Sequence, residues 1–390
     1  MERREDAVYC EGVTPQKTAT EQTTVGFLEL EHANAGLKAQ ILADLADLID
    51  ENAYTNGPAV GAFEEEFARF CGVEHCIGLA SGLDALRLAL LAADIEPGDE
   101  VIVPANTFIA TVEAVTQAGG RPVLVDVTAS DWNLDVSAAA SALTPKTRFA
   151  LPVHLYGQLA DMVGLTELGR RKGLTVVEDA CQAHGAVRDG VSAGTAGLAG
   201  AFSFYPAKNL GAMGDAGALV TRDPEVAARV RALREHGQRR KYHHDLQGYT
   251  ARLDTIQAVV LRRKLPLLHE WNAQRRAAAA FYGEALDGVG DLTLPAVPAG
   301  SEPAWHLYVV TTADPDSLAA FLHERGIGTG RHYPQPIHLS PAYAELGHRR
   351  GAFPVTERLA ETALSLPIFP GITEAQLEAV VSAVAAYFSG

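Results

Sequence analysis

The chain alternates short apolar segments with stretches of helical periodicity, and this alternation is the feature that most limits its fold. Most of the segments stay apolar at consecutive positions and several are rich in Val and Ile, which is typical of strands covered on both faces. They are Cys76–Ala80, Glu100–Val103, Pro122–Val127, Phe149–Val153, Leu174–Glu178, Ala201–Tyr205 and Ala218–Thr221. Helical stretches such as Asp84–Ala92, Phe108–Ala118 and Met162–Lys172 lie between them. The sequence therefore predicts an α/β fold with a mostly parallel central sheet.

The two ends of the chain differ from this central pattern. Residues 1–24 are polar and lack a hydrophobic period, so we expect a flexible tail. The stretch Leu253–Leu286 predicts a helical connector. After it, a strand is expected over Trp305–Thr312 and helices over Pro315–Arg325 and Thr373–Phe388. We therefore expect a large domain over residues 25–265 and a smaller C-terminal α+β domain over residues 266–390.

Composition narrows the possible functions. Lys and Arg total 32 against 48 Asp and Glu, a formal charge of −16 and the opposite of the balance in duplex-binding proteins. No apolar run approaches the ~20 residues that cross a bilayer, and the N-terminus lacks the apolar core of a secretory signal. The cysteines (Cys10, Cys71, Cys76 and Cys181) form no Cys-x-x-Cys pair and have no His at zinc spacing. We expect a cytoplasmic protein with reduced thiols and with no metal, nucleic-acid or membrane partner.

Polar residues follow three predicted strands, at the edge where open α/β sheets bind ligands. The first group, Ser81-Gly82-Leu83-Asp84, begins a helix, where free N–H groups favour an anion and Gly82 permits its close approach. Ser81 and Asp84 also have the spacing of a capping box, so a simple helix cap explains the segment equally well. No Gly-x-Gly-x-x-Gly motif or Walker lysine accompanies it.

The second group contains two acids in succession, Glu178 and Asp179. Neighbouring strand residues point to opposite faces, so one carboxylate can enter a cleft while the other faces away. The alternative is an Asp that only turns the chain into the next loop.

The third group places Lys208 a few residues past a strand, in a stretch that is almost uncharged and rich in small residues. An amine in such a pocket loses basicity by desolvation, as imine formation requires. Ser203 can hold a phosphate. A solvated lysine on a loop is the alternative.

Together these segments resemble the pyridoxal-phosphate-dependent sugar aminotransferases of the DegT/DnrJ/EryC1/StrS family. The motifs are SGLDALRLAL, EDACQAHGA, FSFYPAKNLGAMGDAGALVT, PANTFIATVEAV, PVHLYGQLADM, RLDTIQAVVLRRKL, HYPQPIHLSPAY and LSLPIF. The resemblance covers nearly everything from Gly26 to the C-terminus. It implies an aspartate-aminotransferase-like fold of type I, pyridoxal 5′-phosphate (PLP) as cofactor, and a homodimer with shared active sites.

The resemblance also implies roles for individual residues. Lys208 would bond covalently to the cofactor aldehyde, and Asp179 would pair with the pyridine nitrogen. The other expected cofactor contacts are Gly82, Leu83 and Ser203 at the phosphate, Phe108 stacked on the ring and Gln182 at the ring hydroxyl. Relatives often carry Asn where this chain has Thr250, and that Asn reaches the phosphate of the neighbouring subunit. Relatives with His in place of the lysine are dehydratases, and Lys208 argues against that branch.

Two further segments are candidates for substrate binding. The basic run Arg239–His244 is either a solvated loop or a contact for a diphosphate, and the resemblance favours a diphosphate contact through Lys241, Tyr242 and His243. His332, Tyr333 and His338 belong to a segment that lies near the substrate in relatives. Their spacing does not suggest a metal site. His184 either contacts the substrate or orients Gln182 and the backbone.

The reaction implied by the resemblance is transamination of a nucleotide-diphosphate-linked keto-deoxyhexose, at carbon 3 in preference to carbon 4. Glutamate is the expected amino donor, and the product would serve the biosynthesis of deoxyamino sugars for antibiotics or polysaccharides. One alternative is amination of a keto-cyclitol (an inosose) in aminoglycoside assembly. A more distant alternative is a regulatory protein that binds PLP without turnover, against which Lys208 argues.

Overall fold

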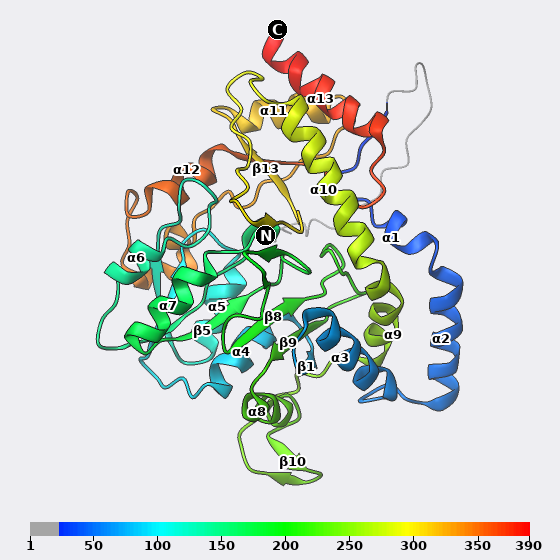
Figure 1. Cartoon of the computed structure of the whole chain (residues 1–390), viewed down its shortest axis with the longest axis vertical. Helices are drawn as coiled ribbons and strands as arrows, with labels where there is room; N and C mark the ends of the chain where they lie inside the picture. Colours follow the sequence, from blue (N-terminus) through cyan, green and yellow to red (C-terminus); the bar gives the residue numbers. More distant parts are fainter. Residues whose placement is uncertain (1–22) are drawn as a thin grey trace, which may run out of the picture.

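A computed structural model describes residues 23–390 of the chain (Figure 1). The predicted tail over residues 1–24 lies almost wholly outside the described residues. Val25 is fully buried and forms an isolated parallel bridge with Ile327. It packs in the hydrophobic cluster of the C-terminal elements, although the sequence placed it in the large domain. The division into domains at residue 265 remains a proposal.

The centre of the molecule is a seven-stranded sheet with the strand order β1-β9-β8-β5-β4-β2-β3. Its pairs are parallel except those that include β9, which is antiparallel to both of its neighbours. The strands are β1 (His75–Leu79), β2 (Glu100–Pro104), β3 (Arg121–Val125), β4 (Thr147–Ala150), β5 (Thr175–Asp179), β8 (Ala199–Ser203) and β9 (Gly217–Thr221). The predicted α/β fold is confirmed, and each predicted apolar segment contributes a strand to the sheet. The carboxyl ends of all strands except β9 lie at the same edge of the sheet.

Helices cover both faces of the sheet, which explains why its strands are apolar throughout. Helices α4, α5 and α8 pack on one face, whereas α3, α6, α7 and α9 pack on the other. Within β2, Val101 and Val103 face the first set and Ile102 faces the second. The helices are α1 (Glu31–Ala35), α2 (Lys38–Glu51), α3 (Pro58–Cys71), α4 (Gly82–Ala92), α5 (Ile109–Gln117), α6 (Val136–Ser141), α7 (Met162–Lys172), α8 (Pro224–Arg234), α9 (Thr255–Lys264), α10 (Leu268–Ala285), α11 (Pro315–His323), α12 (Pro354–Thr362) and α13 (Glu374–Ser389), with 3₁₀ turns η1 (Leu155–Gly157), η2 (Leu265–Leu267), η3 (Ile337–Leu339) and η4 (Pro341–Leu346).

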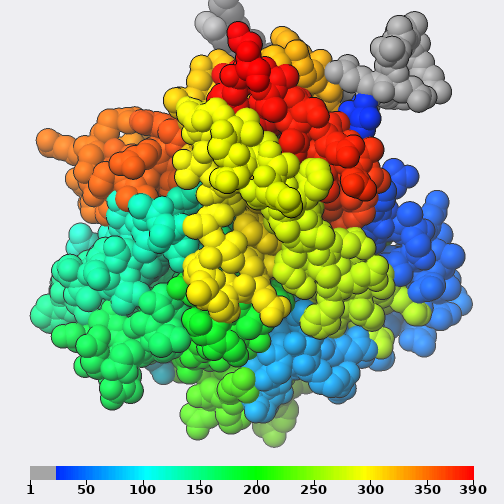
Figure 2. Space-filling view, turned by 45° about the horizontal axis from the view of Figure 1, so that its top comes forward, coloured from blue at the N-terminus to red at the C-terminus, as the bar shows by residue number. Residues whose placement is uncertain are grey.

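The C-terminal elements pack together beside the sheet. Figure 2 shows them, from yellow to red, as a continuous mass over the cyan and green parts of the chain. The antiparallel strands β13 (Tyr308–Thr311) and β14 (Ala363–Leu366) share one hydrophobic cluster with α10, α11 and α13. Within residues 23–390, no helix combines the length and the apolarity needed to cross a bilayer.

The sequence analysis did not predict α1, α6, α8, α12, β14 or the strands of two or three residues outside the main sheet. These strands are β6 (Val187–Arg188), β7 (Val191–Ser192), β10 (Gln238–Arg240), β11 (His243–His244) and β12 (Ser301–Glu302). Helix α12 has no cap from its own N-cap residue, Phe353. Instead Asp126, which follows β3, accepts bonds from the backbone N–H groups of Val355 (2.9 Å) and Thr356 (3.0 Å) and from the Thr356 hydroxyl (2.8 Å). A carboxylate from the central sheet thus caps a helix more than 200 residues later in the chain.

Candidate active site

The polar segments found in the sequence meet at the edge where all strands but β9 end. Ser81 follows β1, Asn106 follows β2, Asp179 ends β5 and Ser203 ends β8. This is the edge at which open α/β sheets bind their ligands.

Gly82, at the start of α4, lies against the segments that carry Cys181 and Ser203. A Cβ atom on Gly82 would stand 2.6 Å from the Sγ of Cys181 and 2.8 Å from the Cβ of Ser203, so only glycine fits. Ser81 is the N-cap of α4, and its hydroxyl accepts a bond of 3.0 Å from the Asp84 N–H, which confirms the cap. The N–H groups of Gly82 and Leu83 belong to the first turn, where a helix offers them no partner, so the cap leaves room for an anion as well.

The carboxylate of Asp179 is buried and held from two sides. Its Oδ1 accepts a bond of 3.1 Å from the Cys181 N–H, and its Oδ2 accepts a bond of 2.8 Å from the Thr111 hydroxyl. The Oγ1 atoms of Thr111 and Thr107 are 2.8 Å apart. Since the single proton of Thr111 points to Asp179, Thr107 must be the donor in this second bond. Two buried hydroxyls therefore fix the orientation of the acid.

Glu178 faces the opposite side of β5, as the alternation of strand side chains requires. Its Oε1 accepts bonds from the N–H groups of Ala196 (2.8 Å) and Gly197 (2.7 Å), and its Oε2 accepts from the Gly194 N–H (2.9 Å). His154 Nε2 lies 2.8 Å from the same Oε2. Glu178 is fully buried, and these hydrogen bonds attach the loop from Gly194 to Gly197 to the sheet. Only Asp179 faces the ligand edge.

Lys208 lies on the loop that follows β8, as the sequence predicted. Burial lowers the pKa of its ammonium below the usual range, although the Asp179 carboxylate acts in the opposite direction. The next residue, Asn209, is locked in place: its Nδ2 donates to the Ala304 carbonyl (2.7 Å) and to Asn272 Oδ1 (3.0 Å). Its Oδ1 lies 3.2 Å from His306 Nδ1. An amine of reduced basicity is thus held on a rigid loop.

Gln182, Tyr333 and Phe108 form one wall of the site. Gln182 is buried; its Nε2 donates to the Tyr333 hydroxyl (3.1 Å), and its Oε1 accepts from the Tyr156 N–H (2.8 Å). The ring centres of Phe108 and Tyr333 are 5.5 Å apart, and Phe108 is half exposed. A face of the Phe108 ring therefore remains available for stacking.

His332 also lies in this region. Its Nδ1 is 2.8 Å from the Ser365 hydroxyl, and its ring stacks on Phe27. Burial, followed by the charge of Lys208, lowers the pKa of His332 to about 4, so its ring is neutral at physiological pH. Contact of His332 and Tyr333 with substrate stays a prediction.

Two of the expected substrate residues, His184 and His338, have buried side chains in this chain. His184 is fully buried between the rings of Phe202 and Phe204, and its ring nitrogens have no partner among residues 23–390. His338 is buried as well, with its Nε2 2.9 Å from Glu357 Oε1. Both rings are buried in this single chain. Contact of His184 or His338 with substrate, and the alternative that His184 orients Gln182, stay predictions.

The remaining candidates lie on the hairpin of β10 and β11, which Figure 1 shows projecting beyond α8, away from the C-terminal elements. Lys241, Tyr242 and His243 are exposed there, and within one chain they are not brought together with Lys208. Thr250 is exposed too, with its hydroxyl 3.2 Å from His236 Nε2. The contact between Thr250 and a phosphate remains a prediction.

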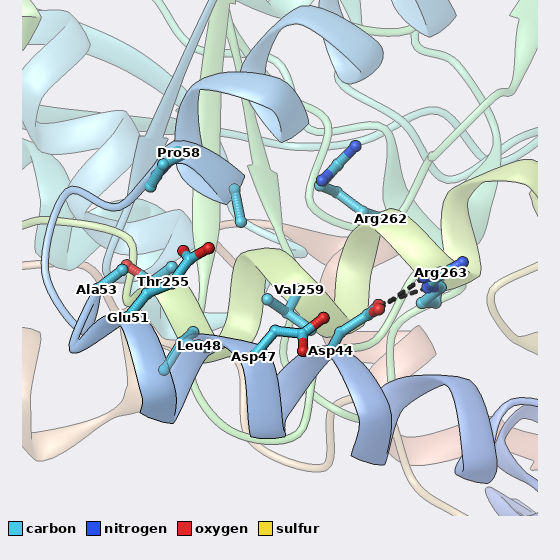
Figure 3. Close-up of a pocket in the computed structure, with 11 residues that line it drawn as sticks. Asp44, Asp47, Leu48, Glu51, Ala53, Pro58, Thr255, Val259, Arg262 and Arg263 are labelled. Atoms are coloured by element: carbon cyan, nitrogen blue, oxygen red, sulfur yellow. Dashed lines mark hydrogen bonds and ion pairs between the residues drawn. The ribbon is translucent and has the colours of Figure 1, made fainter.

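A separate cavity of about 320 Å³ lies between α2, α3 and α9 (Figure 3). Three of its charged lining residues form ion pairs: Arg263 Nη2 donates to Asp44 Oδ1 (2.6 Å), and Arg262 pairs with Glu66 (2.8 Å). Asp47 and Glu51 also line it and form no ion pair within residues 23–390. None of the candidate site residues lines it, and we assign it no role.

Sequence reasoning missed Thr107, Thr111 and Tyr156, which orient Asp179 and Gln182. Thr107 and Thr111 are four residues apart at the start of a predicted helix, a spacing that places both hydroxyls on one side and could have identified them. Tyr156 adopts a left-handed backbone conformation (φ +59°) that its sequence context does not indicate.

Comparison with known proteins agrees with this geometry. A family model described as the DegT/DnrJ/EryC1/StrS aminotransferase family matches residues 36–385. The dTDP-3-amino-3,4,6-trideoxy-α-D-glucose transaminase of Streptomyces venezuelae is 47% identical over 364 residues, which cover 93% of this chain and 96% of the relative. The UDP-N-acetyl-3-dehydro-α-D-glucosamine 3-aminotransferase of Acidithiobacillus ferrooxidans is 43% identical over 365 residues, covering 94% and 98%. The crystal structure of S. venezuelae DesV in complex with a ketimine intermediate has a TM-score of 0.92 at 47% identity, over 94% of this chain and 99% of that one.

The residues at the sheet edge fit PLP. Gly82 lets Cys181 and Ser203 approach the start of α4, whose first-turn N–H groups can bind a phosphate. Asn106 is 6% exposed, and its Nδ2 has no partner within the described part of the chain, as expected of a group that faces a ligand. An amine and a buried carboxylate complete the set that PLP chemistry requires. The chain therefore belongs to the DegT/DnrJ/EryC1/StrS aminotransferase family and is a PLP-dependent aminotransferase with the type I fold.

Proposed function

We propose that this aminotransferase acts on a nucleotide-diphosphate-linked keto-deoxyhexose and aminates carbon 3. The names of its relatives support the substrate class: one is a transaminase of a dTDP-linked 3-amino sugar, and another is a 3-aminotransferase of a UDP-linked 3-dehydro sugar. The observation that carries the proposal is the presence of the Lys208 amine and the Asp179 carboxylate at the ligand edge of one sheet.

PLP, when bound, supplies an electron sink that stabilises negative charge at the reacting carbon. Asp179 is oriented to hold a proton at the ring nitrogen, because its two oxygens are already fixed by Thr111 and the Cys181 N–H. With PLP bound, the Lys208 amine, of lowered pKa, would be the base that takes the proton from the α-carbon of the amino donor and the acid that returns it. Glutamate is the donor that we propose.

The diphosphate would be bound by the hairpin of a second subunit. At its base lies a cavity of about 520 Å³ whose lining includes the acid Glu235 and the cations Arg231, Arg239, Arg240 and Lys241. None of these cations forms an ion pair with a residue in the range 23–390, so they are available to an anionic ligand. The hairpin projects beyond its own subunit, which supports a homodimer with shared active sites.

The substrate class is tested with a panel of keto sugars and glutamate as donor, with products identified by mass and NMR. Formation of a 3-amino sugar from a nucleotide-linked 3-keto sugar is expected. Turnover of an inosose but of no nucleotide sugar would favour the keto-cyclitol alternative. Absence of turnover with every keto substrate, from protein that binds PLP, would favour a regulatory role.

The shared site is tested by mixing two inactive variants. One carries Lys208→Ala, and the other carries Arg239→Ala, Arg240→Ala and Lys241→Ala. If each active site combines both subunits, dissociation and reassociation should restore about a quarter of the wild-type activity, because half of the dimers are mixed and each mixed dimer has one intact site. Mixtures that stay inactive although mixed dimers form would contradict the shared site.

A further inference from the structure

Two cations are buried behind the Lys208 loop without an acidic partner. Arg275 of α10 is 2% exposed and Lys264 at the end of α9 is 4% exposed. Neither lies within 4.0 Å of a carboxylate in the part of the chain that the structure describes. Burial lowers the pKa of Arg275 to about 9 and that of Lys264 to about 8. A buried charge is ordinarily paired, because burying it alone costs several kcal/mol.

The guanidinium of Arg275 is satisfied on one side only. Its Nη1 donates to the carbonyls of Ile368 (2.9 Å), Trp305 (3.1 Å) and His306 (3.4 Å). Its Nε is buried without a partner among residues 23–390, and all its hydrogen bonds to these residues come from Nη1. The Nε–Nη2 edge is the side of an arginine that binds a carboxylate with two parallel bonds. Arg275 thus presents an unused anion-binding edge on a rigidly held side chain.

Lys264 is likewise incompletely satisfied. Its Nζ donates to the Gly211 carbonyl at 2.8 Å, which uses one of the three donors of an ammonium group. Gly211 lies on the loop that carries Lys208. The bond therefore joins Lys264 to this loop and leaves two donors free.

Both cations line one small cavity of about 30 Å³, together with the loop from Pro206 to Asn209. This is room for one or two water-sized groups. Glu29 also lines it, but its Oε1 accepts from the Gly26 N–H (3.2 Å) and its Oε2 pairs with His32 (3.3 Å). Asn34 contributes a buried Oδ1 without a partner among the described residues. The Glu29 carboxylate lies more than 4.0 Å from the side-chain nitrogens of both cations, so it forms an ion pair with neither.

We propose that this cavity binds one small monovalent anion, a halide or a carboxylate group, between the Nε–Nη2 edge of Arg275 and the ammonium of Lys264. The anion offsets one of the two positive charges and, through Lys264 and Gly211, stabilises the loop that holds Lys208. The site does not depend on the proposed sugar substrate.

Bromide locates the anion directly. Crystals of the PLP-loaded protein soaked in sodium bromide should show an anomalous peak within hydrogen-bonding distance of Arg275 Nε and Lys264 Nζ. In solution, bromide should raise the Tm of the wild type by about 1–3 °C in a saturable manner, because it binds only the folded state. The absence of both the peak and the saturable rise would overturn the proposal, since the cavity would then hold water alone.

Two variants on α9 distinguish bromide binding at this site from a general effect of salt on Tm. Lys264→Met keeps the length of the side chain and removes the charge, so the saturable response to bromide should disappear. Arg263→Gln, one residue earlier on the exposed side of the same helix, should respond like the wild type. An equal bromide response in wild type and Lys264→Met would contradict the proposal. If Lys264→Met does not fold, the bromide peak in the wild type decides.

Competition identifies the source of the anion. Sodium formate and sodium glutamate are added separately to bromide-soaked crystals. Loss of the bromide peak with formate alone supports a site for a free small anion. Loss with glutamate as well supports a site for the carboxylate of an amino acid. Retention of the peak in both restricts the site to halides, which still agrees with the proposal.

Discussion

Replacing Thr111 by Val should slow both half-reactions by about 10–150-fold while leaving the fold intact. Thr111 is 1% exposed, and its hydroxyl donates at 2.8 Å to the carboxylate of Asp179. Val has a similar shape, so the packing of α5 is preserved. A hydrogen bond to a charged group contributes about 1.5–3 kcal/mol. At 1.36 kcal/mol for each factor of ten, its loss in the transition state gives the range above.

The half-reactions can be measured separately, by following the absorbance of the bound cofactor in single turnovers with amino donor and then with keto substrate. Thr111→Ser keeps the hydroxyl and is the matched control, with rates expected within a few-fold of wild type. The melting temperatures of both variants should remain close to that of the wild type. Thr111→Val rates within a factor of two of wild type would refute the reasoning, because Asp179 would then not depend on the hydroxyl.

Three further predictions concern the amine, a helix cap and a buried histidine. Lys208→Ala should abolish the visible absorbance of covalently bound PLP; an unchanged spectrum would contradict its role. Asp126→Ala should lower the free energy of unfolding by about 1–2 kcal/mol, because the cap of α12 is lost. Asp126→Asn keeps an oxygen acceptor and should lower it less. Equal Tm values for the wild type and both variants would show that the cap is unimportant. Burial lowers the pKa of His184 from 6.5 to about 3, so the stabilising contribution of its neutral form is present above pH 6.5 and is lost as the pH falls from there towards 3. The Tm of the wild type should therefore fall more steeply in this interval than that of His184→Phe, and parallel curves would disprove the link.

The fold was largely predictable because two-sided burial leaves a direct trace in the sequence. Strands such as β2 and β9 are buried at every position, so their apolar runs stand out. Polar residues at the ends of these strands then identified the ligand edge, including Asp179 and Lys208. Helix α8 was missed although Asp223 and Pro224 form a recognisable start signal.

Other features were not predictable, because they depend on tertiary contacts. The polar motifs around His184 and His338 do not show that neighbouring aromatic rings and Glu357 enclose these side chains. The cap that Asp126 provides joins residues far apart in the chain. Periodicity carries no information about such pairs.

The back-to-back placement of Glu178 and Asp179 has a consequence for how the enzyme can evolve. A one-residue slip of β5 would move each carboxylate to the opposite face of the sheet, turning Asp179 towards the loop around Gly197 and Glu178 towards the ligand edge. Such a slip would break the anchor and the chemistry together. Insertions before this strand should therefore be absorbed in the preceding loop, and the bonds from Glu178 to the loop around Gly197 also keep Asp179 at the ligand edge.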